Sequence, residues 1–141
     1  MGEVAVTSLA EQLLVLGRAQ QDLLAGLGTA LAEDGLSVEQ WRVLGAISRL
    51  GSPTMGELAE ATATANATLS RVVDGLEDAA AVFRHQDAAD RRRIAVHLTD
   101  LGQHRLTRAD AIAAAWSASA RQRLGADAIA AVTRAADLLR R

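Results

Sequence analysis

Apolar residues recur every three or four positions at both ends of the chain, the spacing of one face of an α-helix. The pattern predicts helices over residues 7–33 and 38–50, and two closing helices over 100–124 and 126–141. The first helix carries the clearest apolar stripe: Leu9, Leu13, Leu16, Leu24, Leu27 and Leu31. Gly35 follows this helix, where a left-handed residue is expected to end it.

Two capping boxes lie close together in the middle of the chain. Ser37-Val38-Glu39-Gln40 and Thr54-Met55-Gly56-Glu57 each place a hydroxyl three residues before an amide or carboxylate. In this arrangement the two side chains satisfy the free backbone N–H groups of a helix start. The second box predicts a short helix over 55–61, and a further helix is expected over 65–78.

After residue 78 the hydrophobic period changes to alternation. Residues 81–84 and 94–98 are β-compatible runs on either side of a charged tip. A lone two-stranded hairpin is marginally stable, so this one is expected to lean on the helices. The predicted fold is one domain, 1–141, mostly α with a small β-hairpin wing. A winged helix-turn-helix lobe at 36–99 is flanked by long helical regions, 1–34 and 100–141, that are expected to dimerise.

The composition agrees with a helical protein and excludes several classes. Alanine, the best helix former, supplies 31 residues, and there is one proline. There is no cysteine, so disulfides and thiol chemistry are excluded, and a cytoplasmic location is expected. No run reaches the ~18–20 apolar residues of a membrane span, and the N-terminus does not resemble a secretory signal.

Charge by itself does not predict a nucleic-acid partner, because the net charge is −2. The basic residues are all arginine, which suits two-point contacts to phosphate and guanine but also follows from genomic base composition. Locally, residues 84–93 hold four arginines and His85 against Asp87 and Asp90.

The helix over 65–78 presents two unlike faces. Its apolar stripe is Leu69, Val72, Val73 and Leu76. The opposite side is expected to carry Thr64, Ala67, Thr68, Arg71 and Gly75, flanked by Asn66 and Ser70. This side is small and polar and has no carboxylate before Asp74, whereas an ordinary solvated face normally carries several charges. It is typical of a recognition helix in a major groove.

The hairpin tip that follows is expected to act as a wing. Its arginines can grip phosphates or enter a minor groove, and Asp87 and Asp90 are expected to pair with some of them and hold the tip rigid. The predicted DNA contacts are Thr54, Thr64, Asn66, Ala67, Thr68, Ser70, Arg71, Arg84, Arg91, Arg92 and Arg93.

The sequence resembles the multiple-antibiotic-resistance regulator (MarR) family. The resemblance rests on Leu58-Ala59-Glu60, on residues 68–77, on Asp87-Ala88-Ala89-Asp90-Arg91-Arg92 and on Leu98-Thr99-Asp100-Leu101-Gly102. It implies a dimer of intertwined terminal helices with two winged domains on successive major grooves. Such proteins are usually repressors released by a small ligand or by oxidation. The predicted dimer interface comprises Leu9, Leu13, Leu16, Ile129, Val132 and Leu139.

Several positions depart from the family pattern. Ala63 and Ala80 replace glycines that are common there, so both turns are expected to differ locally. Basic residues are frequent at three positions that here hold Asn66, Gly75 and Ala89. Their absence predicts weaker electrostatic binding to DNA phosphates. Arg91 is then the expected tip contact, with Arg92 bracing the wing against an aspartate.

A ligand pocket is expected between the terminal helices and the lobe, with Trp41, Arg42, His104 and Arg105 as candidate contacts. No metal site is expected, because the spacing of His85, His97 and His104 matches no ligand motif. No cofactor is expected. Enzyme activity is not expected either, since there is no phosphate loop or nucleophile elbow.

Two hypotheses follow. The leading one is a transcriptional regulator, a ligand-responsive repressor, that binds a pseudo-palindromic double-stranded DNA operator as a homodimer and responds to a small-molecule effector. The alternative is a helical protein-interaction module of winged-helix shape that has lost DNA binding, as the net charge and the missing basic residues would permit.

Overall fold

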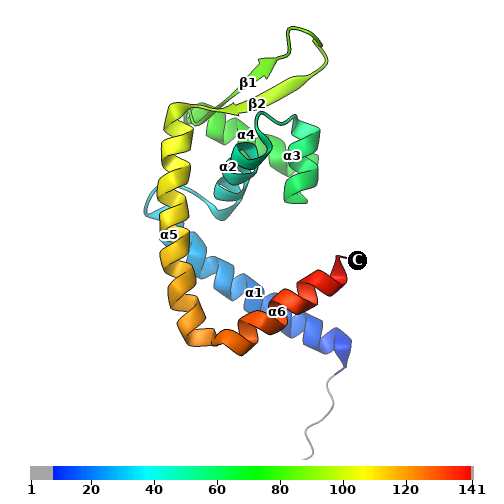
Figure 1. Cartoon of the computed structure of the whole chain (residues 1–141), viewed down its shortest axis with the longest axis vertical. Helices are drawn as coiled ribbons and strands as arrows, with labels where there is room; N and C mark the ends of the chain where they lie inside the picture. The colour runs from blue at the N-terminus through cyan, green and yellow to red at the C-terminus, as the bar shows by residue number, and fades with distance from the viewer. Residues whose placement is uncertain (1–7, 141) are drawn as a thin grey trace, which may run out of the picture.

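The computed structural model describes residues 8–140, which form six helices and one two-stranded hairpin (Figure 1). The elements run α1 (Leu9–Ala32), α2 (Val38–Leu50), α3 (Met55–Thr62), α4 (Asn66–Asp78), β1 (Val82–Gln86), β2 (Ile94–Leu98), α5 (Asp100–Leu124) and α6 (Ala126–Leu139). Helix α5 connects two parts of the molecule, with α2–α4 and the hairpin around its first half and α1 and α6 towards its other end (Figure 1). The predicted fold class is confirmed.

Both predicted capping boxes are present. Ser37 Oγ accepts the Gln40 N–H at 3.1 Å, and Thr54 Oγ1 accepts the Glu57 N–H at 3.2 Å. In each box the third-position side chain returns a bond to the backbone N–H of the cap residue. The starts of α2 and α3 are therefore encoded locally, as the sequence predicted.

Helix α1 begins with a third capping box, which sequence reasoning missed. Ser8 Oγ accepts the Glu11 N–H at 3.2 Å, and the Glu11 carboxylate accepts the Ser8 N–H at 2.8 Å. The bond from the Ser8 backbone, followed by that from its hydroxyl, holds the pKa of Glu11 below its usual range.

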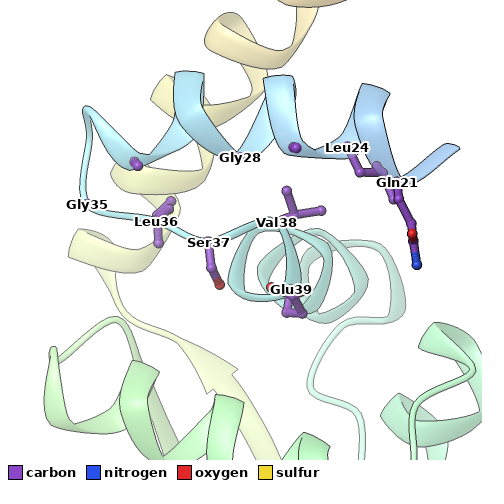
Figure 2. A pocket seen from close by; sticks show the side chains of 10 residues that line it. Gln21, Leu24, Gly28, Gly35, Leu36, Ser37, Val38 and Glu39 are labelled. Carbon is purple, nitrogen blue, oxygen red and sulfur yellow. The ribbon is translucent and has the colours of Figure 1, made fainter. Parts of the chain in front are cut away.

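The buried residues of α1 lie in its last two turns. Leu27 and Leu31 are buried, whereas the earlier leucines of the stripe are exposed. Here α1 crosses the start of α2, and Val38 points at α1 between Leu24 and Gly28 (Figure 2). An open hollow of about 650 Å³ remains between the two helices.

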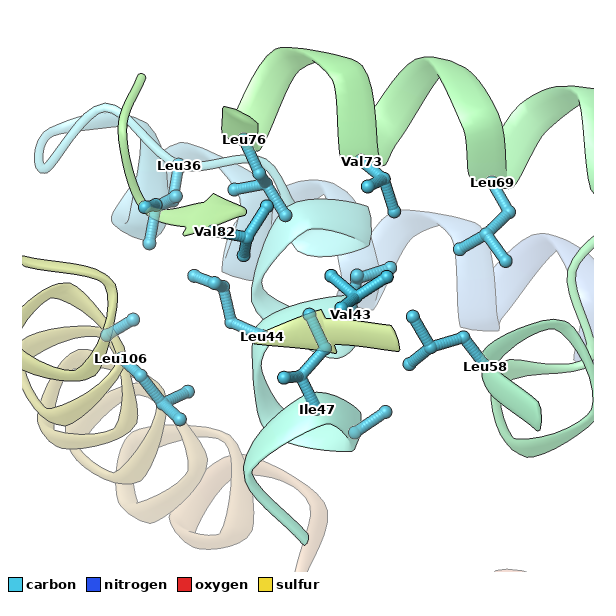
Figure 3. Packing of buried hydrophobic residues seen from close by; sticks show 14 of the residues in the cluster. Leu36, Val43, Leu44, Ile47, Leu58, Leu69, Val73, Leu76, Val82 and Leu106 are labelled. Atoms are coloured by element: carbon cyan, nitrogen blue, oxygen red, sulfur yellow. The ribbon is translucent and has the colours of Figure 1, made fainter. Parts of the chain in front are cut away.

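The core of the lobe lies where α2 meets α3, α4 and the hairpin (Figure 3). Leu44 and Ile47 of α2 stand at its centre, and Leu106 closes it from α5. The largest fully buried side chains are Leu31, Leu36, Leu44, Ile47, Leu58, Leu69, Leu76, Val73, Val82, Val96 and Pro53. Leu69, Val73 and Leu76 of the apolar stripe predicted for α4 belong to this set, whereas Val72 of the same stripe is half-buried.

The hairpin is held to the lobe through β2. Strands β1 and β2 pair antiparallel with Arg84 opposite Val96. The Val96 N–H donates to the Pro53 carbonyl at 2.8 Å, and Thr54 forms an isolated bridge with Ala95, so the segment before α3 serves as a short third strand. The expectation that the hairpin leans on the helical lobe is therefore confirmed.

The two turns with alanine in place of glycine keep a left-handed backbone. Ala63 has φ 49° and Ala80 has φ 57°. Hydrogen bonds to the ends of α3 and α4 hold both alanines in that conformation. A left-handed L-residue costs about 1–2 kcal/mol, so each turn stores strain that a glycine would relieve.

The start of α5 presses against the end of the turn after α4. Ala81 is fully buried, and its carbonyl accepts the Thr99 N–H at 3.0 Å. Thr99 Oγ1 donates to the Ala80 carbonyl and also caps α5 by accepting the Gly102 N–H. A Cβ at Gly102 would lie 1.9 Å from the Ala81 carbonyl oxygen, so a hydrogen is required at this position.

We predict that Gly102→Ala lowers the free energy of unfolding by about 3 kcal/mol or more, because two backbone segments must separate to admit a methyl group. Chemical denaturation of the purified chain measures this loss. The control is Gly56→Ala in α3, where the added Cβ meets only Thr54 Oγ1 at 3.9 Å. That change should raise stability by about 0.5–1 kcal/mol. A loss below ~1 kcal/mol for Gly102→Ala would contradict the close approach.

Candidate nucleic-acid interface

One side of α4 is open to solvent and small. Asn66, Ala67, Ser70 and Arg71 are exposed along it, and we call these four residues the recognition face. The face carries no carboxylate. The Arg71 guanidinium forms no ion pair with any residue between 8 and 140, so it is available to an external partner.

The start of α4 adds a positive end to this face. Its N-cap residue, Ala65, supplies no side-chain hydrogen bond, and the first turn contains no acidic residue. The first N–H groups of the helix are therefore not satisfied by a capping side chain, and a helix N-terminus of this kind accommodates phosphate oxygens.

Two other predicted DNA contacts make hydrogen bonds within the chain, and a third is half-buried. Thr54 Oγ1 caps α3, and Thr64 Oγ1 donates to the Thr62 carbonyl at 3.1 Å. Thr68 is half-buried. The predicted outward orientation of Gly75 is wrong, because a Cβ there would lie 3.7 Å from the side-chain nitrogen of Gln40 on α2.

Two of the predicted DNA-contacting arginines are engaged in ion pairs. Arg84 bridges α4 and the wing, with its guanidinium 2.8 Å from Asp74 and 3.3 Å from Glu77. Arg93 lies 3.2 Å from Glu57, the capping glutamate of α3. These pairs fix the hairpin against both helices of the helix-turn-helix.

The tip of the wing is braced by backbone bonds. Asp87 accepts the Ala89 N–H at 2.9 Å, and Asp90 accepts the Arg92 N–H at 3.0 Å. The predicted pairing of these aspartates with arginine side chains is wrong, because the carboxylates close tight turns in the loop instead. Arg91 and Arg92 are left exposed, without ion pairs in the described part of the chain.

The predicted ligand residues divide into two groups. Trp41 Nε1 donates to Asp110 at 2.8 Å, and Arg42 donates to the Thr62 carbonyl at 2.6 Å. Both line a polar hollow of about 200 Å³, together with Gly45, Arg49, Ala61, Thr62 and Asp110. We call it the α2–α3–α5 hollow.

The other two predicted ligand residues lie outside this hollow. Arg105 donates instead to the carbonyls of Asp34 and Gly35, and His104 is exposed on α5. Sequence reasoning did not find Asp110, which is 69 positions from Trp41 with no motif to connect them.

Two of the three histidines gather at the base of the wing. His97 Nδ1 lies 2.7 Å from Ser52 Oγ, Phe83 stacks on the His97 ring at 4.9 Å, and His85 meets it edge-on at 6.1 Å. Between residues 8 and 140 no three histidine or carboxylate side chains gather closely enough to hold a metal ion.

The predicted dimer contacts are accessible in the single chain. Leu9, Leu13 and Leu16 are 50–70% exposed, and Val132 and Leu139 are 58% and 82% exposed. Ile129 is half-buried and lines an apolar hollow of about 390 Å³ between α1, α5 and α6. Across residues 8–140 no helix is both long and apolar enough to cross a membrane.

The succession of α3, a tight turn, α4 and a paired hairpin defines a winged helix-turn-helix protein. Residues 34–93 match the sequence model of the MarR family, so the resemblance carried by the motifs is confirmed. No curated protein sequence matches the chain.

Solved structures are similar over nearly the whole chain. The transcriptional repressor CouR, bound to a 23-mer DNA duplex, is 25% identical with a TM-score of 0.86, covering 99% of this chain and 100% of CouR. BpsR of Bordetella bronchiseptica, whose DNA binding is regulated by 6-hydroxynicotinic acid, is 24% identical with a TM-score of 0.83, covering 93% and 99%. A cysteine-to-serine variant of MarR from E. coli in complex with operator DNA is 22% identical with a TM-score of 0.81, covering 94% and 99%.

Proposed function

We propose that this chain is a transcriptional repressor that binds a pseudo-palindromic operator in double-stranded DNA as a homodimer. A small ligand releases the repressor from this operator. The recognition face is the observation that carries the proposal. Its exposed side chains are small or polar, and its one charged residue is an arginine without an ion pair in the described chain. A face of this kind fits a major groove about 12 Å wide.

The wing and the similar structures support the same proposal. Arg91 and Arg92 lie exposed in the loop between β1 and β2, and exposed arginines of a wing can meet a phosphate backbone or a minor groove. CouR and the MarR variant are DNA complexes, and DNA binding by BpsR responds to an organic acid. A regulator of this kind acts where the DNA is, in agreement with the cytoplasmic location expected from the sequence.

The α2–α3–α5 hollow is the proposed effector site. Its lining holds two arginines, Arg42 and Arg49, against one carboxylate, Asp110, so the lining carries an excess of positive charge. Trp41 adds an aromatic side chain. This composition favours a small organic anion over a cation.

A gel shift with the DNA upstream of the protein's own gene tests the proposed function. Salt-sensitive binding to a pseudo-palindrome with half-sites about one helical turn apart is expected, and binding should weaken when benzoate is added. Indifference to DNA at low salt would favour the alternative, a protein-interaction module. Unchanged binding with benzoate, and no change in Trp41 fluorescence in a Trp116→Phe background, would argue against an effector site for such acids.

The arginines of the interface should separate by role. Arg71→Ala should cost ~1–3 kcal/mol of binding, concentrated at one base pair if Arg71 reads a base. Arg91→Ala should weaken binding to all sequences and reduce the salt slope by about one, because one phosphate contact is lost. Arg84→Ala is the control. Since Asp74 and Glu77 already hold this side chain, the salt slope should not change. A slope reduced equally by Arg84→Ala would contradict the wing assignment.

The dimer prediction concerns the exposed leucines of α1 and α6. Leu13→Glu or Leu139→Glu should convert the dimer to a monomer, because each buries a carboxylate in an apolar interface. Sedimentation equilibrium measures the mass of the particle. Leu101→Glu is the control, since Leu101 is 48% exposed, similar to Leu13 at 52%, but belongs to the start of α5 outside the predicted interface. A dimer that persists in both test variants would refute the assignment.

A further inference from the structure

The turn between α3 and α4 is held by a side chain from a third helix. Arg42 on α2 donates through Nη2 to the carbonyl oxygen of Thr62 at 2.6 Å, and the two residues are 20 positions apart in sequence. Thr62 is the last residue of α3 and is buried. A hydrogen bond from a guanidinium to a carbonyl at the negative end of a helix is charge-assisted and favoured by the helix dipole.

This turn contains a strained residue. Ala63 follows Thr62 with φ 49° and ψ 44°, the left-handed conformation that favours glycine. The backbone N–H groups of Ala63 and Thr64 are bonded to the carbonyls of Glu60 and Ala59. The Thr64 hydroxyl also donates to the Thr62 carbonyl, at 3.1 Å. Without a glycine, the turn depends on these three bonds and on the Arg42 contact to keep its shape.

The turn between α3 and α4 also sets the position of the recognition face. Ala65, two residues beyond Ala63, is the N-cap of α4 and makes no side-chain capping bond. Asn66 and Ala67 follow directly. The position of these first residues of α4 therefore depends on the turn more than on any capping side chain.

Resting on the proposed function, we infer that Arg42 is a positioning residue for DNA binding. Its guanidinium holds the Thr62 carbonyl, which keeps the strained turn closed and the start of α4 in its binding orientation, and Arg42 itself does not contact DNA. The same guanidinium forms one wall of the α2–α3–α5 hollow, so a ligand there would touch the group that holds the turn.

The test combines Arg42→Gln with a glycine at one of the two strained alanines, in the full chain, and measures binding to the upstream DNA fragment across salt concentrations. Arg42→Gln should weaken binding about tenfold, because a hydrogen bond to a charged donor is lost, and should leave the salt slope unchanged. Adding Ala63→Gly should restore most of the affinity by relieving the strain in the turn. Adding Ala80→Gly, which relieves similar strain at a turn that Arg42 does not contact, should not.

Three outcomes of the binding measurements would overturn the inference. A salt slope reduced by about one in Arg42→Gln would make Arg42 a phosphate contact. Equal rescue by Ala80→Gly would reduce the effect to general stability. Unchanged affinity in Arg42→Gln would show that the turn does not need the contact.

Amide hydrogen exchange on the free protein separates this inference from the proposed function. In Arg42→Gln, exchange at Ala63 and Thr64 should accelerate about tenfold relative to exchange at Val96, whose N–H bonds the Pro53 carbonyl. If the wild-type chain binds no DNA while this local acceleration is seen, the proposed function fails and the contact between Arg42 and the turn stands. Equal acceleration at all three amides would overturn the positioning role.

Discussion

The contact between Ala81 and the start of α5 is the constraint on which the rest of the structure depends. The Ala81 carbonyl accepts the Thr99 N–H, and Gly102 lies against the same carbonyl. This one buried position joins the end of α4, both ends of the hairpin and the first turn of α5. The direction of α5 and the orientation of the wing relative to α4 are therefore set together. A regulator that presents a helix and a wing to one duplex needs the two held in a fixed orientation relative to each other.

Local signals predicted the elements well, because each depended on residues close in sequence. The hydroxyls of Ser37 and Thr54 cap the helices they were expected to cap. The alternating run of β2 also became a strand, with Val96 buried. The exposed side of α4 followed from helical spacing, apart from Gly75, which faces Gln40 of α2. The orientation of Gly75 depends on how α2 packs on α4, and this packing cannot be predicted from the residue spacing within one helix.

Partners of charged side chains were predicted poorly, for a physical reason. Aspartates next to arginines in sequence suggested ion pairs at the wing tip, yet Asp87 and Asp90 accept backbone N–H groups of the loop. A short side chain in a tight turn reaches its own backbone more readily than the flexible head of a neighbouring arginine. Conversely, Arg84 forms an ion pair with Asp74, and Arg93 forms one with Glu57. Both pairs join different elements and depend on the folded position of the hairpin, so the sequence did not predict them. The contact between Trp41 and Asp110 was likewise not predicted, since the two residues meet through tertiary packing alone.

The division of arginines explains how a chain of net charge −2 can still present a basic surface. Arg84 and Arg93 are neutralised by carboxylates that hold the wing in place, so they add rigidity more than attraction for phosphate. Under the proposed function Arg71, Arg91 and Arg92 remain for DNA, three in each protomer of the proposed dimer. If each met a phosphate in a dimer, the salt slope would be roughly −5. Such moderate electrostatic attraction makes affinity depend on how accurately α4 is placed. The strained turn at Ala63 then affects DNA affinity as much as charge does. A small displacement of α4 cannot be offset by non-specific electrostatic binding to the phosphates.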